Sequence, residues 1–183
     1  MKKNNNRTSI RTLGSFSFYQ EINYIINDSL GSIIFTNNEK ILIKERAFYV
    51  VNYICMNYLT SIETYNKALR NILGFKYKIP IYLSSNLIII FTKNIKAYYN
   101  IFINYNNILS AVKVNEKIVL TFKNNETLNT EYSVKSFNNQ VNRINILIKK
   151  MPFKWNIDNT FIINNIDNVY NKCYNIIEIF NVS

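Results

Sequence analysis

Hydrophobic and polar positions alternate in a way that first predicts strands. Residues 19–27 alternate weakly, and residues 32–36 form a β-branched run, as expected of short strands. Turn-forming residues at 28–31 separate these two segments, and residues 37–39 form a second turn before an apolar stretch at 40–44. The first part of the chain is therefore predicted to contain three short antiparallel strands.

A helical period follows. Apolar residues recur at alternating spacings of three and four, which is the pattern of one buried helix face. The period predicts one helix over residues 46–73, with Gly74 where a glycine commonly ends a helix. The predicted buried face consists of Phe48, Val51, Cys55, Tyr58, Ile62, Tyr65, Leu69 and Ile72.

The second strand-rich part is built from short apolar runs. The predicted strands cover residues 81–83, 87–92, 101–105 and 108–114. They are followed by the clearest hairpin, in which residues 116–123 and 126–134 flank a turn at Asn124 and Asn125. In the first strand of this hairpin, one face carries Lys117, Val119, Thr121 and Lys123, and the other carries Ile118, Leu120 and Phe122.

Two helices are predicted to follow the hairpin. The first covers residues 137–150 with Ser136 as its N-cap, and the second covers residues 160–180. The buried stripe of the first helix is predicted to consist of Phe137, Val141, Ile144 and Ile148. The fold class is therefore α+β: a mainly antiparallel β-sheet with about three helices in a single domain, residues 17–183, behind a flexible polar basic tail at residues 1–16.

Charge points to the class of partner. The net charge is +11 at pH 7 and the pI is near 9.6, which favours nucleic acid, an acidic membrane surface or an acidic protein as a partner. A Lys-rich solvated surface without a binding role is the alternative. No signal peptide is recognised, and the longest apolar run, residues 87–91, is too short to span a membrane. A soluble cytoplasmic protein that does not engage a membrane is expected.

Missing residue types exclude most catalytic chemistry. The chain has no His, so Ser-His-Asp triads, Cys-His pairs and His-ligated metals are excluded. Cys55 and Cys173 are too far apart for a Cys-x-x-Cys site, and with 3 Gly the chain lacks the glycine-rich loops that hold phosphates. We expect no enzyme activity, no cofactor and no metal site.

The basic residues gather near the last hairpin and the helix that follows it. Lys side chains contact phosphate oxygens as point charges, and Asn or Arg side chains can contact base edges. The predicted nucleic-acid-binding residues are Lys117, Lys123, Lys135, Asn138, Asn139, Arg143, Lys149 and Lys150.

The same region resembles a known family. Residues 131–143 read EYSVKSFNNQVNR and residues 119–127 read VLTFKNNET, which is similar to the signature and preceding hairpin of the ComK competence transcription factors. A second similar block combines Cys55 with the KIPI stretch at residues 78–81. The resemblance extends over roughly residues 19–180, and only the 119–143 block is specific by itself. Residues 59–66 lack the glycines and the Arg-Lys pair that many members carry there.

The resemblance implies a DNA-binding transcriptional activator of competence and DNA-uptake genes. Its partners would be AT-rich double-stranded DNA, bound through the minor groove, and RNA polymerase, and it would act as a homodimer or higher homo-oligomer. One alternative is a general RNA-binding module, for which Tyr98, Tyr99 and Tyr105 would be exposed for base stacking. Another is a divergent protein-binding regulator that no longer binds DNA.

Overall fold

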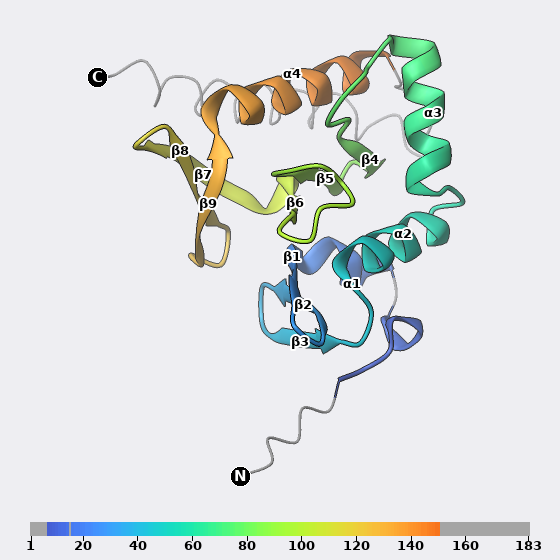
Figure 1. The fold of residues 1–183 in the computed structure, drawn as a ribbon, viewed down its shortest axis with the longest axis vertical. Coiled ribbons are helices and arrows are strands. Elements are labelled where there is room, and N and C mark those ends of the chain that lie inside the picture. Colours follow the sequence, from blue (N-terminus) through green and yellow to red (C-terminus); the bar gives the residue numbers. More distant parts are fainter. Residues whose placement is uncertain (1–6, 15, 151–183) are drawn as a thin grey trace. The chain divides into compact units, whose positions relative to one another are not determined.

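A computed structural model describes residues 7–14 and 16–150, and these fall into two compact units (Figure 1). Unit 1 comprises the described residues up to Asn107, and unit 2 those from Ile108 onward. Both consist of antiparallel sheets and helices, so the α+β class is confirmed. The helix predicted over residues 160–180, with Cys173, lies outside the described residues.

Unit 1 contains a six-stranded antiparallel sheet in the order β3-β2-β1-β6-β5-β4. One half consists of the first predicted strand-rich part and the other of the first three strands of the second part, and the halves are joined by pairing of β1 with β6. The predicted strand over residues 108–114 belongs to the separate three-stranded sheet. The strands are β1 (Ile22–Asp28), β2 (Gly31–Thr36), β3 (Lys40–Ile43), β4 (Ile81–Ser84), β5 (Leu87–Phe91) and β6 (Ile101–Asn104). A short 3-10 turn, η2 (Tyr105–Asn107), ends the unit.

The turn between β1 and β2 depends on one glycine. The Asp28 side chain accepts a hydrogen bond from the Leu30 backbone N–H at 3.0 Å, which closes the turn. Gly31 then adopts φ +150, and a Cβ atom there would lie 2.2 Å from the carbonyl oxygen of Ile43. Only glycine fits this approach between neighbouring strands.

The prediction of one helix over residues 46–73 is wrong, because two helices occupy this segment: α2 (Ala47–Asn57) and α3 (Ile62–Leu73). Leu59 has a positive φ of 57, which stops α2. The Ser61 side chain accepts from the Thr64 N–H at 3.1 Å and caps a new helix. The apolar period conceals the break because the residues on either side of it, Tyr58 and Ile62, are both buried.

Most of the predicted buried face survives this break. Gly74 ends α3 in the left-handed conformation, as predicted. Phe48 is half-buried and Ile72 is exposed. The other six predicted positions are buried: Val51, Cys55, Tyr58, Ile62, Tyr65 and Leu69.

The segment before β1 differs from the expected loose tail over residues 7–14. Thr8 forms a bridge with Ile43, and Ile10 lies in a 3-10 turn, η1 (Ile10–Thr12), with its side chain buried. The Arg7 guanidinium donates hydrogen bonds to backbone carbonyls of β2 and β3, and its distance to the Ile43 carbonyl oxygen is 2.9 Å. A short helix, α1 (Phe16–Glu21), replaces the start of the first predicted strand.

Unit 2 contains a three-stranded antiparallel sheet, β7-β8-β9, followed by one long helix. The strands are β7 (Ile108–Val114), β8 (Lys117–Phe122) and β9 (Thr127–Ser133), and the helix is α4 (Val134–Lys150). The predicted hairpin is confirmed, with Asn125 at φ 65 in its turn. Its buried face, which includes Ile118, Leu120 and Phe122, forms the core of the unit with α4.

Candidate nucleic-acid interface

The strand β9 continues directly into α4 without a connecting loop. The Ser133 hydroxyl accepts a hydrogen bond from the Ser136 backbone N–H at 3.3 Å, which is the geometry of an N-cap. The predicted cap, Ser136, therefore lies inside the helix, which begins at Val134. This direct connection fixes the direction of α4 relative to the hairpin.

The buried face of α4 differs in part from the predicted stripe. Phe137, Val141 and Ile144 are buried as predicted, and the Phe137 ring meets the Tyr132 ring of β9 edge-on, with centroids 5.7 Å apart. Gln140 is also fully buried, and its side-chain amide donates to the Tyr132 hydroxyl. The prediction that Ile148 is buried is wrong: Ile148 is only half-buried, and the neighbouring Leu147 is buried instead.

The outer face of α4 carries most of the predicted site. Lys135, Asn139, Lys149 and Lys150 are exposed, and they follow the helical period away from the core. No acidic residue occurs between Val134 and Lys150. The exposed side of α4 is therefore a mainly basic and amide-rich surface without acidic residues, interrupted by the exposed Ile146, and we call it the α4 face.

Asn138 and Arg143 border the α4 face and are half-buried. Burial lowers the pKa of Arg143, and the nearby Tyr132 hydroxyl acts in the opposite direction. Burial raises the pKa of Tyr132, while its hydrogen bond with Ser136 and the charge of Arg143 lower it. Arg143 is thus held beside Tyr132 at the edge of the core, and its guanidinium remains charged at neutral pH.

Two predicted residues, Lys117 and Lys123, are on the hairpin and not on α4. Lys117 is on the face of β8 opposite the buried one, and its Nζ atom pairs with Glu131 Oε1 at 2.7 Å. Lys123 is exposed beside the hairpin turn. The structure therefore brings six of the eight predicted residues onto one helix and places Lys117 and Lys123 elsewhere in unit 2.

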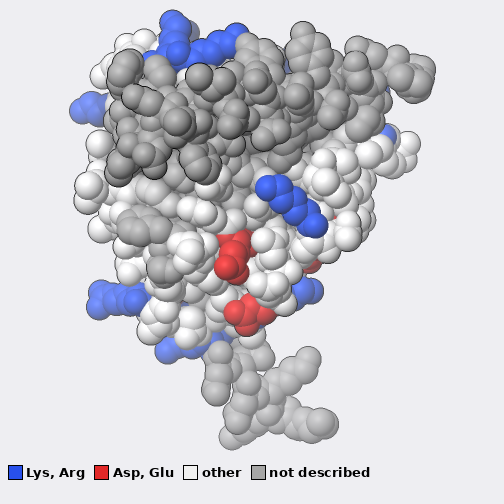
Figure 2. Space-filling model, turned by 180° about the vertical axis from the view of Figure 1, so that it is seen from behind, with Lys and Arg blue, Asp and Glu red and all other residues white. Residues whose placement is uncertain are grey.

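Ion pairing concentrates the positive charge on α4. Residues 108–150 contain seven basic and three acidic residues. On the hairpin, Lys113 pairs with Glu116 at 2.5 Å and Lys117 pairs with Glu131. Such exposed pairs add little stability, but they reduce the local positive charge. Among the residues that Figure 2 draws in colour or white, acidic side chains occupy only a small area.

The tyrosines proposed for base stacking divide into two groups. Tyr98 and Tyr99 are exposed, at 40% and 77%. Tyr105 is 1% exposed in η2, so it cannot act as a stacking platform. The prediction that all three would be exposed in an RNA-binding module is wrong for Tyr105.

Comparison with known proteins decides the family. The sequence model for the ComK protein family matches residues 21–154, which is more than half of the chain. The chain belongs to the ComK family. ComK proteins are competence transcription factors that bind DNA and are not enzymes. No curated protein and no solved structure matches this chain.

Several residues in the ComK-like blocks have structural roles. Gln140 is a buried hydrogen-bonding partner of Tyr132, as described above. Lys78 is half-buried and its Nζ atom donates to the Thr92 carbonyl at 2.6 Å, while burial lowers its pKa. The sequence alone did not reveal these roles, because a polar residue inside an apolar stripe looks like an exposed position.

Among the described helices, none has the length and apolar character required to cross a membrane.

Proposed function

We propose that the chain is a transcriptional activator that recognises AT-rich boxes through the minor groove, with unit 2 as its main contact surface. The α4 face carries the proposal, because it is exposed and contains only basic and neutral side chains over its whole length. Binding would occur as a homodimer or higher homo-oligomer in the bacterial cytoplasm, in association with the nucleoid, and would assist RNA polymerase at promoters of DNA-uptake genes.

The dimensions of the DNA grooves suggest which part of unit 2 would contact the minor groove and which part would contact the phosphates. An α-helix with side chains is about 10–12 Å wide, whereas the minor groove is about 6 Å wide. The hairpin tip exposes Lys123, Asn124 and Asn125, whose side-chain N–H groups are donors that suit the acceptors of A·T pairs in the minor groove. We therefore assign groove contact to the tip and phosphate contact to the α4 face.

The test compares two double variants of the full chain. Lys135→Gln with Lys150→Gln removes two charges from the α4 face. Lys113→Gln with Lys117→Gln removes two charges that are already paired with Glu residues. Each phosphate contact contributes about 0.9 to the slope of log K against log salt, so the first variant should lower the slope by roughly 1.8 and the second by much less.

The measurement is a salt titration on DNA with two A-tract/T-tract boxes and on a GC-rich control, with footprinting to locate the protected bases. A flat salt dependence for the wild type would refute the nucleic-acid assignment. Equal effects of the two double variants would refute the α4 face as the phosphate contact. Equal affinity for both DNA molecules would refute recognition of AT-rich boxes.

A further inference from the structure

A second group of basic and aromatic side chains lies in unit 1, where the loop from β5 to β6 meets the start of α2, and all of them except the half-buried Phe48 are exposed. Arg46 lies 5.9 Å from the ring centroid of Tyr98. Lys93 lies 6.0 Å from the centroid of Tyr99, and Lys96 lies 5.8 Å from that of Phe48. These distances are within the range of cation–π contacts. We call this group the loop cluster: Arg46, Phe48, Lys93, Lys96, Tyr98 and Tyr99.

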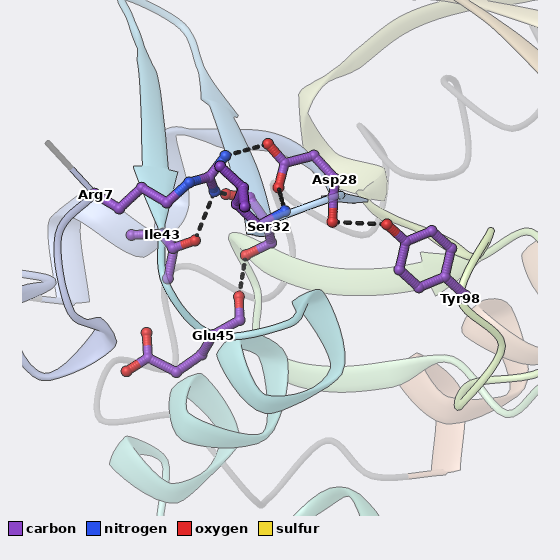
Figure 3. A network of polar contacts seen from close by, with 7 residues as sticks. Arg7, Asp28, Ser32, Ile43, Glu45 and Tyr98 are labelled. Atoms are coloured by element: carbon purple, nitrogen blue, oxygen red, sulfur yellow. Dashed lines mark hydrogen bonds and ion pairs between the residues drawn. The ribbon is translucent and has the colours of Figure 1, made fainter. Parts of the chain in front are cut away.

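The loop cluster is held in place by hydrogen bonds from neighbouring elements. The Tyr98 hydroxyl donates to the Asp28 carbonyl at 2.7 Å (Figure 3). The Asn27 side-chain amide donates to the Tyr98 carbonyl at 2.7 Å. Asn27 also accepts from the Ala47 N–H at the start of α2, at 2.8 Å. One Asn side chain therefore ties β1, α2 and the loop together, so the basic residues are displayed on a fixed frame.

Two acidic residues next to the loop cluster, Asp28 and Glu45, form an ion pair or hydrogen bonds with residues outside the cluster. Asp28 pairs with Arg7, and Glu45 accepts from Ser9 and from the Ile10 N–H (Figure 3 shows Asp28 and Glu45). Partial burial alone would raise the pKa of Asp28, but hydrogen bonds from Arg7 and the turn backbone lower it below its ordinary value. Within residues 7–14 and 16–150, no ion pair includes a basic residue of the loop cluster.

The ligand that fits this arrangement is the phosphate backbone of a nucleic acid. Three positive charges are displayed with no acidic partner among the described residues, and contact with the rings restricts their side chains before binding, which reduces the entropy lost on binding. Tyr99, at 77% exposure, offers a ring surface for a sugar or a base. The polyanion that ComK proteins bind is DNA.

We propose that the loop cluster is a second, sequence-independent contact to the phosphate backbone of duplex DNA. The proposal rests on the proposed function, since it assigns a further surface to the same DNA-binding activity. It predicts that the loop cluster contributes equally to binding of AT-rich and GC-rich DNA, unlike the hairpin tip.

The test uses the full chain carrying Arg46→Gln, Lys93→Gln and Lys96→Gln. The matched control carries Lys67→Gln, Arg70→Gln and Lys76→Gln, which removes the same charge from exposed positions elsewhere in unit 1. The loop-cluster variant should reduce the salt slope by about 2–3 on both DNA molecules, at 0.9 per contact. The control should change it by clearly less. Equal reductions in the two variants would overturn the proposal.

A second measurement uses the wild-type protein and therefore does not require that any variant folds. Lysine acetylation, read by mass spectrometry, should show protection of Lys93 and Lys96 by duplex DNA, but not of Lys67 and Lys76. Lack of protection at Lys93 and Lys96 while the α4 face is protected would overturn this inference alone. If the wild type does not bind DNA in a salt-dependent manner, both this inference and the proposed function are wrong.

Discussion

The buried pair formed by Gln140 and Tyr132 allows the ComK signature to be divided into packing and binding residues. Tyr132→Phe removes only the hydroxyl, so the buried Gln140 amide loses its partner and the half-buried Ser136 side chain loses a hydrogen bond. An unsatisfied buried polar group costs about 1–3 kcal/mol, and we expect the unfolding free energy to fall by that amount. Gln140→Leu keeps most of the volume and leaves Tyr132 with its Ser136 bond, so roughly 1 kcal/mol is expected.

The double variant supplies the decisive comparison. With both polar groups replaced, no Gln140 amide remains unsatisfied, so the combined loss should be smaller than the sum of the two single losses by about 1 kcal/mol. Urea unfolding followed by circular dichroism measures this, because 2 kcal/mol shifts the midpoint by about 1 M.

Binding of the folded variants then separates structure from recognition. Gln140 is fully buried, so folded Gln140→Leu protein should bind AT-rich DNA as the wild type does. A Gln140→Leu variant with unchanged stability but tenfold weaker DNA binding would refute the packing role, because Gln140 would then act at the DNA. Folded Arg143→Ala protein, in contrast, should lose about 1–3 kcal/mol of binding.

Three further predictions concern the frame of unit 1. Gly31→Ala should cost roughly 3–5 kcal/mol of unfolding free energy in a urea titration, because its Cβ atom would meet backbone, whereas Gly74→Ala, with open space around it, should cost about 1–2. Ser61→Ala removes the α3 cap and should cost about 1 kcal/mol by the same assay; no loss would contradict the capping role. Burial raises the pKa of Cys55 to about 12 and raises that of Tyr65, so the unfolded state releases protons that the folded state retains. Stability should therefore be complete below about pH 9 and fall as pH rises, by up to about 1.4 kcal/mol per group and pH unit; a flat profile from pH 8 to 11 would refute this.

Local pattern was sufficient for the strands and hairpins of both sheets. Turn residues and period-two alternation are short-range signals, and the structure places strands within a few residues of where they indicate. The break between α2 and α3 was missed because the apolar period continues through it, while a single positive φ at Leu59 carries no strong sequence signal. The packing of Arg7 against the sheet was missed because its partners are backbone carbonyls of Ser32 and Ile43, which no sequence pattern displays.

The candidate site could be predicted in composition but not in arrangement. Helical spacing was enough to place Asn139 on an outward face, whereas Lys135 was assigned to the hairpin and lies on α4 because that helix begins at Val134. The pairing of Lys117 with Glu131 depends on strand register and on the irregularity between Lys117 and Val119 in β8. The loop cluster could not be predicted, because it joins residues from 46 to 99 through tertiary contacts.

The direct passage from β9 into α4 has a consequence for how the chain can vary in length. An α-helix turns by about 100° per residue, so one residue inserted between Tyr132 and Phe137 would rotate the rest of α4 by that angle. Such a rotation would turn Phe137 and Ile144 out of the core and carry exposed polar residues toward it. A loop would absorb an insertion, but no loop is present between Ser133 and Val134. Inserting or deleting one residue at this point should therefore prevent unit 2 from folding, while single substitutions on the α4 face leave its fold intact.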